Sequence, residues 1–198
     1  MMSQSSNLIP HFSASEAQSL AKDLFGVSAT AQPLPSEQDQ NFLLEPSSGS
    51  QFVLKIANAD QETAILDAQN AALAHLASQA PDLHCPRIHP ATTGELIARA
   101  RGSDGTAHFV RMLTYVPDHL FVHTSPHTSE LLNSLGQFFG QLDRALSPFS
   151  HPALKRRLQW DLKYASKVIE QNIDHLADSD QRNLVTHFLQ RFRKVVLP

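Results

Sequence analysis

The sequence changes character once along its length, and this change limits the folds that the chain can adopt. Before about residue 116, short apolar segments separated by turn residues predict β-strands, with one helix before them and one among them. After Pro117, apolar residues recur at helical spacing. An antiparallel sheet with one inserted helix, followed by helices, is an α+β pattern. We therefore predict an α+β fold with a leader over 1–12, a first lobe over 13–116 and a helical region over 117–198.

Local signals place the individual elements. Ser13 and Glu16 have the spacing of a capping box, and Gly26 is a typical residue at the end of a helix, so the first helix is expected between them. Turn residues separate the strands, as in the segment Pro46–Ser50. The predicted strands cover 28–34, 39–45, 51–57, 87–89, 95–100 and 108–116, and the further predicted helices cover 61–78, 129–146, 158–176 and 181–196.

Charge and composition limit the partners that we expect. The formal net charge of -3 gives no electrostatic reason to expect binding to nucleic acid or to an anionic membrane. No apolar run approaches the roughly 20 residues that a membrane helix needs, and Met1–Pro10 lacks the pattern of a signal peptide. The single cysteine, Cys85, excludes an internal disulfide and fits a reducing compartment. These features favour a cytoplasmic protein.

Lys55 is the first candidate for a functional residue. It lies in the third predicted strand, next to Leu54 and Ile56. A lysine among β-favouring residues either protects an edge strand from pairing or is a cation placed for a ligand. The order of strand, helix and strands favours a ligand, because kinase-like folds carry a phosphate-holding lysine on the third strand and its partner on the next helix. A lysine suits this task because it is a compact charge on a flexible stem.

Several segments resemble, in their order and spacing, the N-terminal part of the aminoglycoside phosphotransferase family of kinase-like proteins: Ser36–Phe42, Phe52–Lys55, Gln69–Leu73 and Arg111–Pro117. The resemblance continues through Leu135–Asp143, His151–Pro152 and Trp160–Leu162, and covers about residues 13 to 198. It is most similar to the branch of hydroxylysine kinases and of kinase domains fused to class III aminotransferases. It implies a protein-kinase-like N-lobe, with an antiparallel sheet of about five strands and one packed helix, followed by the first helices of an incomplete helical C-lobe.

The resemblance implies a nucleotide site around Lys55. Lys55 would hold the nucleotide phosphates, and the segment Ser36–Asn41 matches the loop that covers them. This segment lacks the glycine-rich pattern of protein kinases, so Ser36 and Asn41 side chains would contact phosphate together with backbone amides. Alternatively, Asn41 and Asp39 are ordinary turn or bulge residues. Nucleotide titration with a Lys55→Met control would separate this site from an unrelated α+β domain in which Lys55 is incidental.

Two further parts of the site follow from the same resemblance. The end of the last strand matches the hinge, where backbone groups would face adenine, at Thr114, Tyr115 and Val116. Gln69 stands where many relatives have a glutamate that pairs with the lysine, so a contact with Lys55 would be weaker than an ion pair. Glu62 shares the face of Gln69, whereas Asp67 points elsewhere. Gln69 is alternatively a surface or helix-packing residue.

The family performs its chemistry with a His-x-Asp-x-x-x-x-Asn loop and a later Asp that holds magnesium. No segment of the sequence has this loop pattern, since His175-Leu176-Ala177-Asp178 has one residue too many between His and Asp. ATP and magnesium are the implied cofactors, and the magnesium ligands are expected to be absent. We expect the N-terminal portion of an ATP-dependent phosphotransferase for a small hydroxylated or amino substrate, inactive as this chain alone. The alternative is a non-catalytic truncated product, or a nucleotide- or partner-binding module that self-associates through exposed helices.

Overall fold

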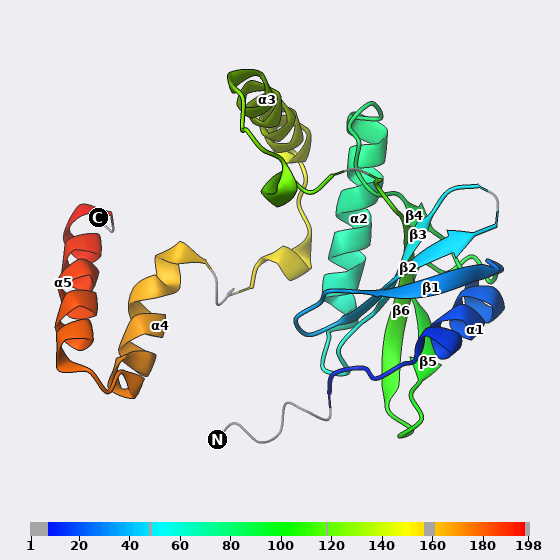
Figure 1. Ribbon diagram of the computed structural model, residues 1–198, viewed down its shortest axis with the longest axis horizontal. Coiled ribbons are helices and arrows are strands. Elements are labelled where there is room, and N and C mark those ends of the chain that lie inside the picture. The colour runs from blue at the N-terminus through cyan, green and yellow to red at the C-terminus, as the bar shows by residue number, and fades with distance from the viewer. Residues whose placement is uncertain (1–7, 48, 118, 157–160, 197–198) are drawn as a thin grey trace. The chain divides into compact units, whose positions relative to one another are not determined.

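The structure is a computed structural model of the chain, and it describes residues 8–47, 49–117, 119–156 and 161–196. The chain forms two compact units, residues 1–154 and 155–198, which we describe separately (Figure 1). The boundary predicted between residues 116 and 117 stays a prediction.

The first unit is built on a six-stranded antiparallel sheet. The strands run in the order β1-β2-β3-β6-β4, and β5 also pairs with β6. This confirms the predicted α+β class, with six strands where about five were expected. The strands are β1 (Ala29–Leu34), β2 (Gln40–Pro46), β3 (Phe52–Ile56), β4 (Ile88–His89), β5 (Ala98–Arg101) and β6 (Ala107–Thr114).

Helix α1 (Ala14–Phe25) covers one face of this sheet. Both hydrogen bonds of the predicted capping box between Ser13 and Glu16 are present, and Gly26 ends the helix with a φ of 70°. A positive φ is accessible to glycine because it has no Cβ. Buried residues of α1 pack against alternate residues of the strands, which form the main hydrophobic core: Ala17, Ala21, Phe25, Ala31, Phe42, Leu44, Leu54, Ile56, Val110 and Met112.

The segment before α1 takes part in this packing. Phe12 is buried in the same core, and its backbone N–H and C=O both bond to the side chain of Gln40, at 2.7 and 2.8 Å. The carbonyl of Leu8 accepts a hydrogen bond from the N–H of Ala59. Residues 8–12 of the expected leader therefore belong to the first unit, and residues 1–7 lie outside the described residues.

Helix α2 (Thr63–Gln79) lies on the other face of the sheet (Figure 1). Side chains of a strand alternate between the two faces. Since Leu54 and Ile56 belong to the α1 core, Lys55 between them points towards the side of α2. Arg111, also on this face, bonds directly to side chains of α2.

The first unit continues past the sheet into helix α3 (Ser129–Leu146), with 3-10 turns at Phe121–His123 and Pro152–Leu154. Thr128 caps the start of α3 by accepting from the N–H of Leu131. The imidazole of His75 on α2 bonds the carbonyl of Ala145 at 2.9 Å, which ties the end of α3 to α2. No residue within Ser129–Leu146 is buried, and Leu132 and Phe139 are 50% and 52% exposed.

The second unit consists of helices α4 (Ala165–Asn172) and α5 (Ser179–Val195), with 3-10 turns at Leu162–Tyr164 and Ile173–His175. In its described part, the helix expected over 158–176 is divided into α4 and the two 3-10 turns that flank it. Residues 158–160 lie outside the described residues. Asp178 caps α5, and an ion pair joins Glu170 of α4 to Arg193 of α5. Among the described residues, no helix combines the length and apolar character needed to cross a lipid bilayer.

Candidate functional site

Lys55 lies in the interior of the sheet. Its strand β3 pairs with β2 on one side and β6 on the other, so the interpretation of Lys55 as an edge-strand lysine is wrong. Leu54 and Ile56 are both 0% exposed, which fixes the strand's other face against the α1 core. Lys55 is therefore a half-buried cation held on a rigid element.

The structure brings together three of the predicted site residues. Lys55 Nζ donates a hydrogen bond of 2.9 Å to Asn41 Oδ1, and Asn41 Nδ2 donates one of 3.2 Å to Ser36 Oγ. Asn41 stands opposite Lys55 in the β2–β3 register, which explains this contact. These side chains line a cavity of about 380 Å³ together with Glu37, Gln38, Asp39 and Gln61.

The charge of Lys55 is only partly compensated by the protein. Burial lowers the pKa of Lys55 from its ordinary value, the nearby carboxylate of Asp39 raises it, and Arg111 lowers it. The carboxylate of Asp39 accepts a hydrogen bond from the N–H of Asn58 at 3.1 Å. Within the described ranges, no ion pair joins Lys55 to a carboxylate. The ammonium group of Lys55 could therefore bind an anionic ligand in the cavity, because its hydrogen-bond partner is a neutral amide.

Arg111 is a site residue that the sequence analysis did not identify. It is 3% exposed and stands directly opposite Lys55 in the β3–β6 register. Burial lowers the pKa of its guanidinium, and Asp39 raises it. The alternation of side chains along each strand predicts which residues share a face of the sheet. It does not predict which residues of two strands stand opposite each other, because this register is not a local property of the sequence.

Gln69 and Lys55 are not joined by a hydrogen bond. Its Oε1 accepts a hydrogen bond from a guanidinium nitrogen of Arg111 at 2.5 Å. The second guanidinium nitrogen donates to Asn70 Oδ1 at 2.9 Å, and Asn70 is itself buried. The helix that follows β3 thus contacts the site through amide oxygens, and these oxygens face Arg111.

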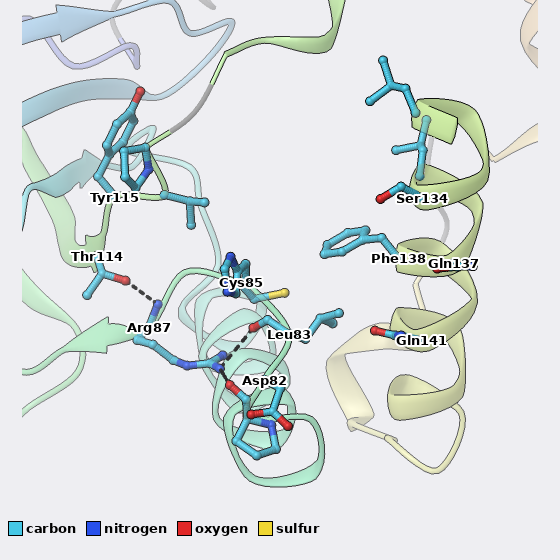
Figure 2. A pocket seen from close by; sticks show the side chains of 16 residues that line it. Asp82, Leu83, Cys85, Arg87, Thr114, Tyr115, Ser134, Gln137, Phe138 and Gln141 are labelled. Atoms are coloured by element: carbon cyan, nitrogen blue, oxygen red, sulfur yellow. Dashed lines mark hydrogen bonds between the residues drawn. The ribbon is translucent and has the colours of Figure 1, made fainter. Parts of the chain in front are cut away.

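The three predicted hinge residues line a different cavity of about 940 Å³ (Figure 2). The N–H of Thr114 donates to the carbonyl of Arg87, and the N–H of Tyr115 donates to the carbonyl of Gln51. These two donors are therefore engaged within the protein. Val116, which is 38% exposed, also lines this cavity. If the backbone of this segment contacts a base, the N–H of Val116 would be the donor and carbonyl oxygens the acceptors.

The larger cavity lies between the loop that follows α2 and helix α3. Figure 2 shows Phe138 of α3 pointing towards the loop that carries Leu83 and Cys85. The guanidinium of Arg87 donates to the carbonyls of Pro81 and Leu83, at 3.0 and 3.3 Å, and so holds this loop in place. The predicted site residues thus fall into two places, one at Lys55 and one at the hinge.

Metal coordination is not apparent in the part of the chain that the structure describes. Within it, no group of three or more His, Cys, Asp and Glu side chains is arranged to hold a metal ion. The cavity at Lys55 combines this cation, which has no ion-pair partner among the described residues, with the carboxylates of Glu37 and Asp39.

Comparison with known proteins gives consistent matches. The model of the "Phosphotransferase enzyme family" matches residues 30–197. Hydroxylysine kinase of Mus musculus is 30% identical over 203 residues, which cover 95% of this chain and 54% of the relative. Hydroxylysine kinase of Danio rerio is 30% identical over 200 residues, which cover 96% and 55%. The chain therefore spans about half the length of the curated relatives that it matches.

Two solved structures share the fold. A microcompartment-associated aminopropanol kinase matches with a TM-score of 0.58 and 21% identity, over 77% of this chain and 46% of that one. Amicoumacin kinase hAmiN, solved in complex with AMP-PNP, Ca2+ and Ami, matches with a TM-score of 0.68 and 13% identity, over 94% and 55%. At these identities the likeness concerns the fold alone, and it confirms the predicted kinase-like N-lobe.

Proposed function

Because this chain belongs to the phosphotransferase enzyme family, we propose that it is the nucleotide-binding portion of an ATP-dependent small-molecule kinase similar to hydroxylysine kinase. The reaction is transfer of the γ-phosphoryl group to a hydroxyl group of a small hydroxylated or amino compound. The 30% identity to hydroxylysine kinases supports this substrate class. The proposal places the protein in the cytoplasm, without a nucleic acid or membrane partner.

The observation that carries the proposal is the state of Lys55. It is a half-buried cation on a central strand, it lines a cavity, and its hydrogen-bond partner is the neutral side chain of Asn41. Buried charges are normally paired, because removing a charge from water is costly. A phosphate group would provide the missing negative charge, while Asn41 and Ser36 would orient the ammonium group. In phosphoryl transfer such a lysine stabilises the charge on the phosphate oxygens.

Magnesium, when bound with ATP in kinases, neutralises charge on the phosphates. We assign no residue of this chain to it, because the described residues contain no suitable cluster. The sequence also contains no His-x-Asp-x-x-x-x-Asn pattern. We therefore propose that this chain alone binds nucleotide without transferring phosphate.

Calorimetric titration of the full chain with AMP-PNP and magnesium tests the nucleotide proposal. We expect binding by the wild type, and about tenfold weaker binding by Lys55→Met, because one charge-assisted hydrogen bond to phosphate is lost. Lys22→Met, in the exposed last turn of α1, is the matched control and should bind like the wild type. No binding by the wild type, or equal binding by Lys55→Met, would refute the proposal. Magnesium-dependent ATP turnover that Lys55→Ala abolishes would refute the predicted inactivity.

The exposed side of α3 favours a second candidate function, self-association or partner binding. Leu132 and Phe139 are seven residues apart, so they lie on the same side of the helix, and each is about half exposed. Apolar side chains gathered on one exposed helix face are typical of protein contact surfaces. Sedimentation velocity over a range of concentrations tests this candidate. We expect a dimer that the double variant Leu132→Glu/Phe139→Glu converts to a monomer, and a concentration-independent monomer in the wild type would exclude self-association.

A further inference from the structure

The Lys55 site contains a second positively charged side chain, that of Arg111. Arg111 on β6 and Lys55 on β3 are direct cross-strand partners, and both side chains lie on the face that α2 covers. Residues opposite each other on neighbouring antiparallel strands have Cβ atoms only about 5 Å apart. The side chains of such residues are neighbours, and the positive charge of Arg111 lowers the pKa of Lys55.

Arg111 is fixed by neutral oxygens. Its two terminal nitrogens donate to Gln69 Oε1 and Asn70 Oδ1, which are consecutive residues of α2. The planar guanidinium presents its donors as a fork, and therefore determines the position of the helix relative to the sheet more strictly than one bond could. Among the described residues, no carboxylate forms an ion pair with Arg111. Arg111 therefore holds α2 through neutral groups of the helix, which do not cancel its positive charge.

This arrangement differs from the lysine–glutamate pair of protein kinases, in which a carboxylate of the helix binds the phosphate-holding lysine. Here the helix offers Gln69 and Asn70, and Arg111 occupies both. Lys55 takes its hydrogen bond from the opposite neighbour, Asn41 on β2. The contact between helix and sheet is therefore independent of Lys55.

We propose that Arg111 is a positioning residue that anchors α2 through the neutral amides of Gln69 and Asn70, adds its positive charge beside Lys55, and thereby makes the site selective for ligands with several phosphate groups. The proposal rests on the nucleotide-binding function proposed above. Arg111 is nearly inaccessible, so it acts on the ligand through its charge and through α2, without contact. Asp39 offsets part of the charge of both cations. The second positive charge of Arg111 favours a triphosphate over a monophosphate, because each added phosphate contributes further negative charge.

A series of ligands that differ only in phosphate number separates charge from structure. The dissociation constants of adenosine, AMP and AMP-PNP are measured for the wild type, Arg111→Met and the matched control Arg101→Met. Arg101 is an exposed arginine of the adjacent strand β5 that bonds the carbonyl of Gly105. We expect Arg111→Met to weaken AMP-PNP binding about tenfold more than adenosine binding, and Arg101→Met to change neither. Equal weakening for all three ligands, or no weakening, would overturn the proposal.

Gln69→Glu provides a second test that does not depend on the folding of Arg111→Met. The new carboxylate would pair with Arg111, so we expect a thermal unfolding midpoint at or above that of the wild type. It would also cancel one positive charge, so AMP-PNP binding should weaken about tenfold while adenosine binding stays unchanged. A purely structural role of Gln69 predicts that stability and affinity change together. Binding of AMP-PNP as tight as in the wild type would overturn the inference and leave the proposed function intact, whereas absence of AMP-PNP binding by the wild type would refute both.

Discussion

The hydrogen bond between Lys55 and Asn41 should be measurable as an energetic coupling between two strands. Asn41→Ala removes the acceptor of a half-buried ammonium group and leaves Lys55 without a hydrogen-bond partner among the described residues. Hydrogen bonds to charged groups contribute about 1.5–3 kcal/mol. Because Lys55 is only partly buried, water can replace some of the lost interaction, and we expect a loss of about 1–2 kcal/mol in the free energy of unfolding.

A double-mutant cycle separates the interaction energy between Lys55 and Asn41 from the other effects of each substitution. The variants are Asn41→Ala, Lys55→Met and the double variant, and their unfolding in urea is followed by circular dichroism. Asn133→Ala, at an exposed position of α3, is the control for replacing an asparagine at the surface and should stay within about 0.5 kcal/mol of the wild type. We expect a coupling energy of about 1 kcal/mol between positions 41 and 55. A coupling below about 0.3 kcal/mol would show that the two side chains do not interact in solution, and would remove the support for an oriented lysine.

Three further predictions concern the elements that hold the site. Leu54→Ala, at a 0% exposed position behind Lys55, should lower the free energy of unfolding by about 2–5 kcal/mol because it leaves a cavity in the core, and chemical unfolding at an unchanged m-value checks this. Ser13→Ala should lower it by about 1 kcal/mol because the hydroxyl that accepts from the N–H of Glu16 at the start of α1 is lost. Separately, hydrogen bonds from the N–H and hydroxyl of Ser13 lower the pKa of Glu16, so the contribution of the Glu16 carboxylate is present above the ordinary pKa of 4.5 and is lost as pH falls through the folded-state pKa, which an acid titration of both proteins would show. Because the pKa of Lys55 is lowered in the folded state, the unfolded chain binds more protons between the folded-state pKa and 10.5. The free energy of unfolding of the wild type, relative to that of Lys55→Met, should therefore rise as pH approaches 10.5. A difference that does not change with pH would contradict the predicted direction.

Local sequence signals identified most of the elements correctly. The capping box at Ser13, the glycine at position 26 and the alternating strands each depend on residues only a few positions apart, so their physical causes are visible in the sequence. Where helical spacing of apolar residues was the only signal, the prediction was less accurate. Of the helix expected over 158–176, the part described from residue 161 contains a 3-10 turn that Asp161 caps by accepting from the N–H of Lys163, and α4 ends at Asn172.

The candidate site was predictable in part. Lys55, Asn41 and Ser36 were identified from the sequence and are linked by hydrogen bonds in the structure. Their role in nucleotide binding stays a proposal. For Gln69 the sequence left two alternatives open, a weak contact with Lys55 or a surface or helix-packing residue. In the structure Gln69 bonds Arg111, and its direction depends on how α2 lies against the sheet.

The sequence by itself determined the order of helices and strands, the family, and the presence of a lysine on the third strand. Only the tertiary structure decided what surrounds that lysine. Residues 55 and 111 become neighbours through the register of two strands that are far apart in the sequence, and a shift of one residue would place Arg111 on the other face. The same packing gives the amide oxygens of α2 to Arg111 and leaves Lys55 with Asn41. The electrostatic character of the site therefore depends on long-range pairing, which no local pattern encodes.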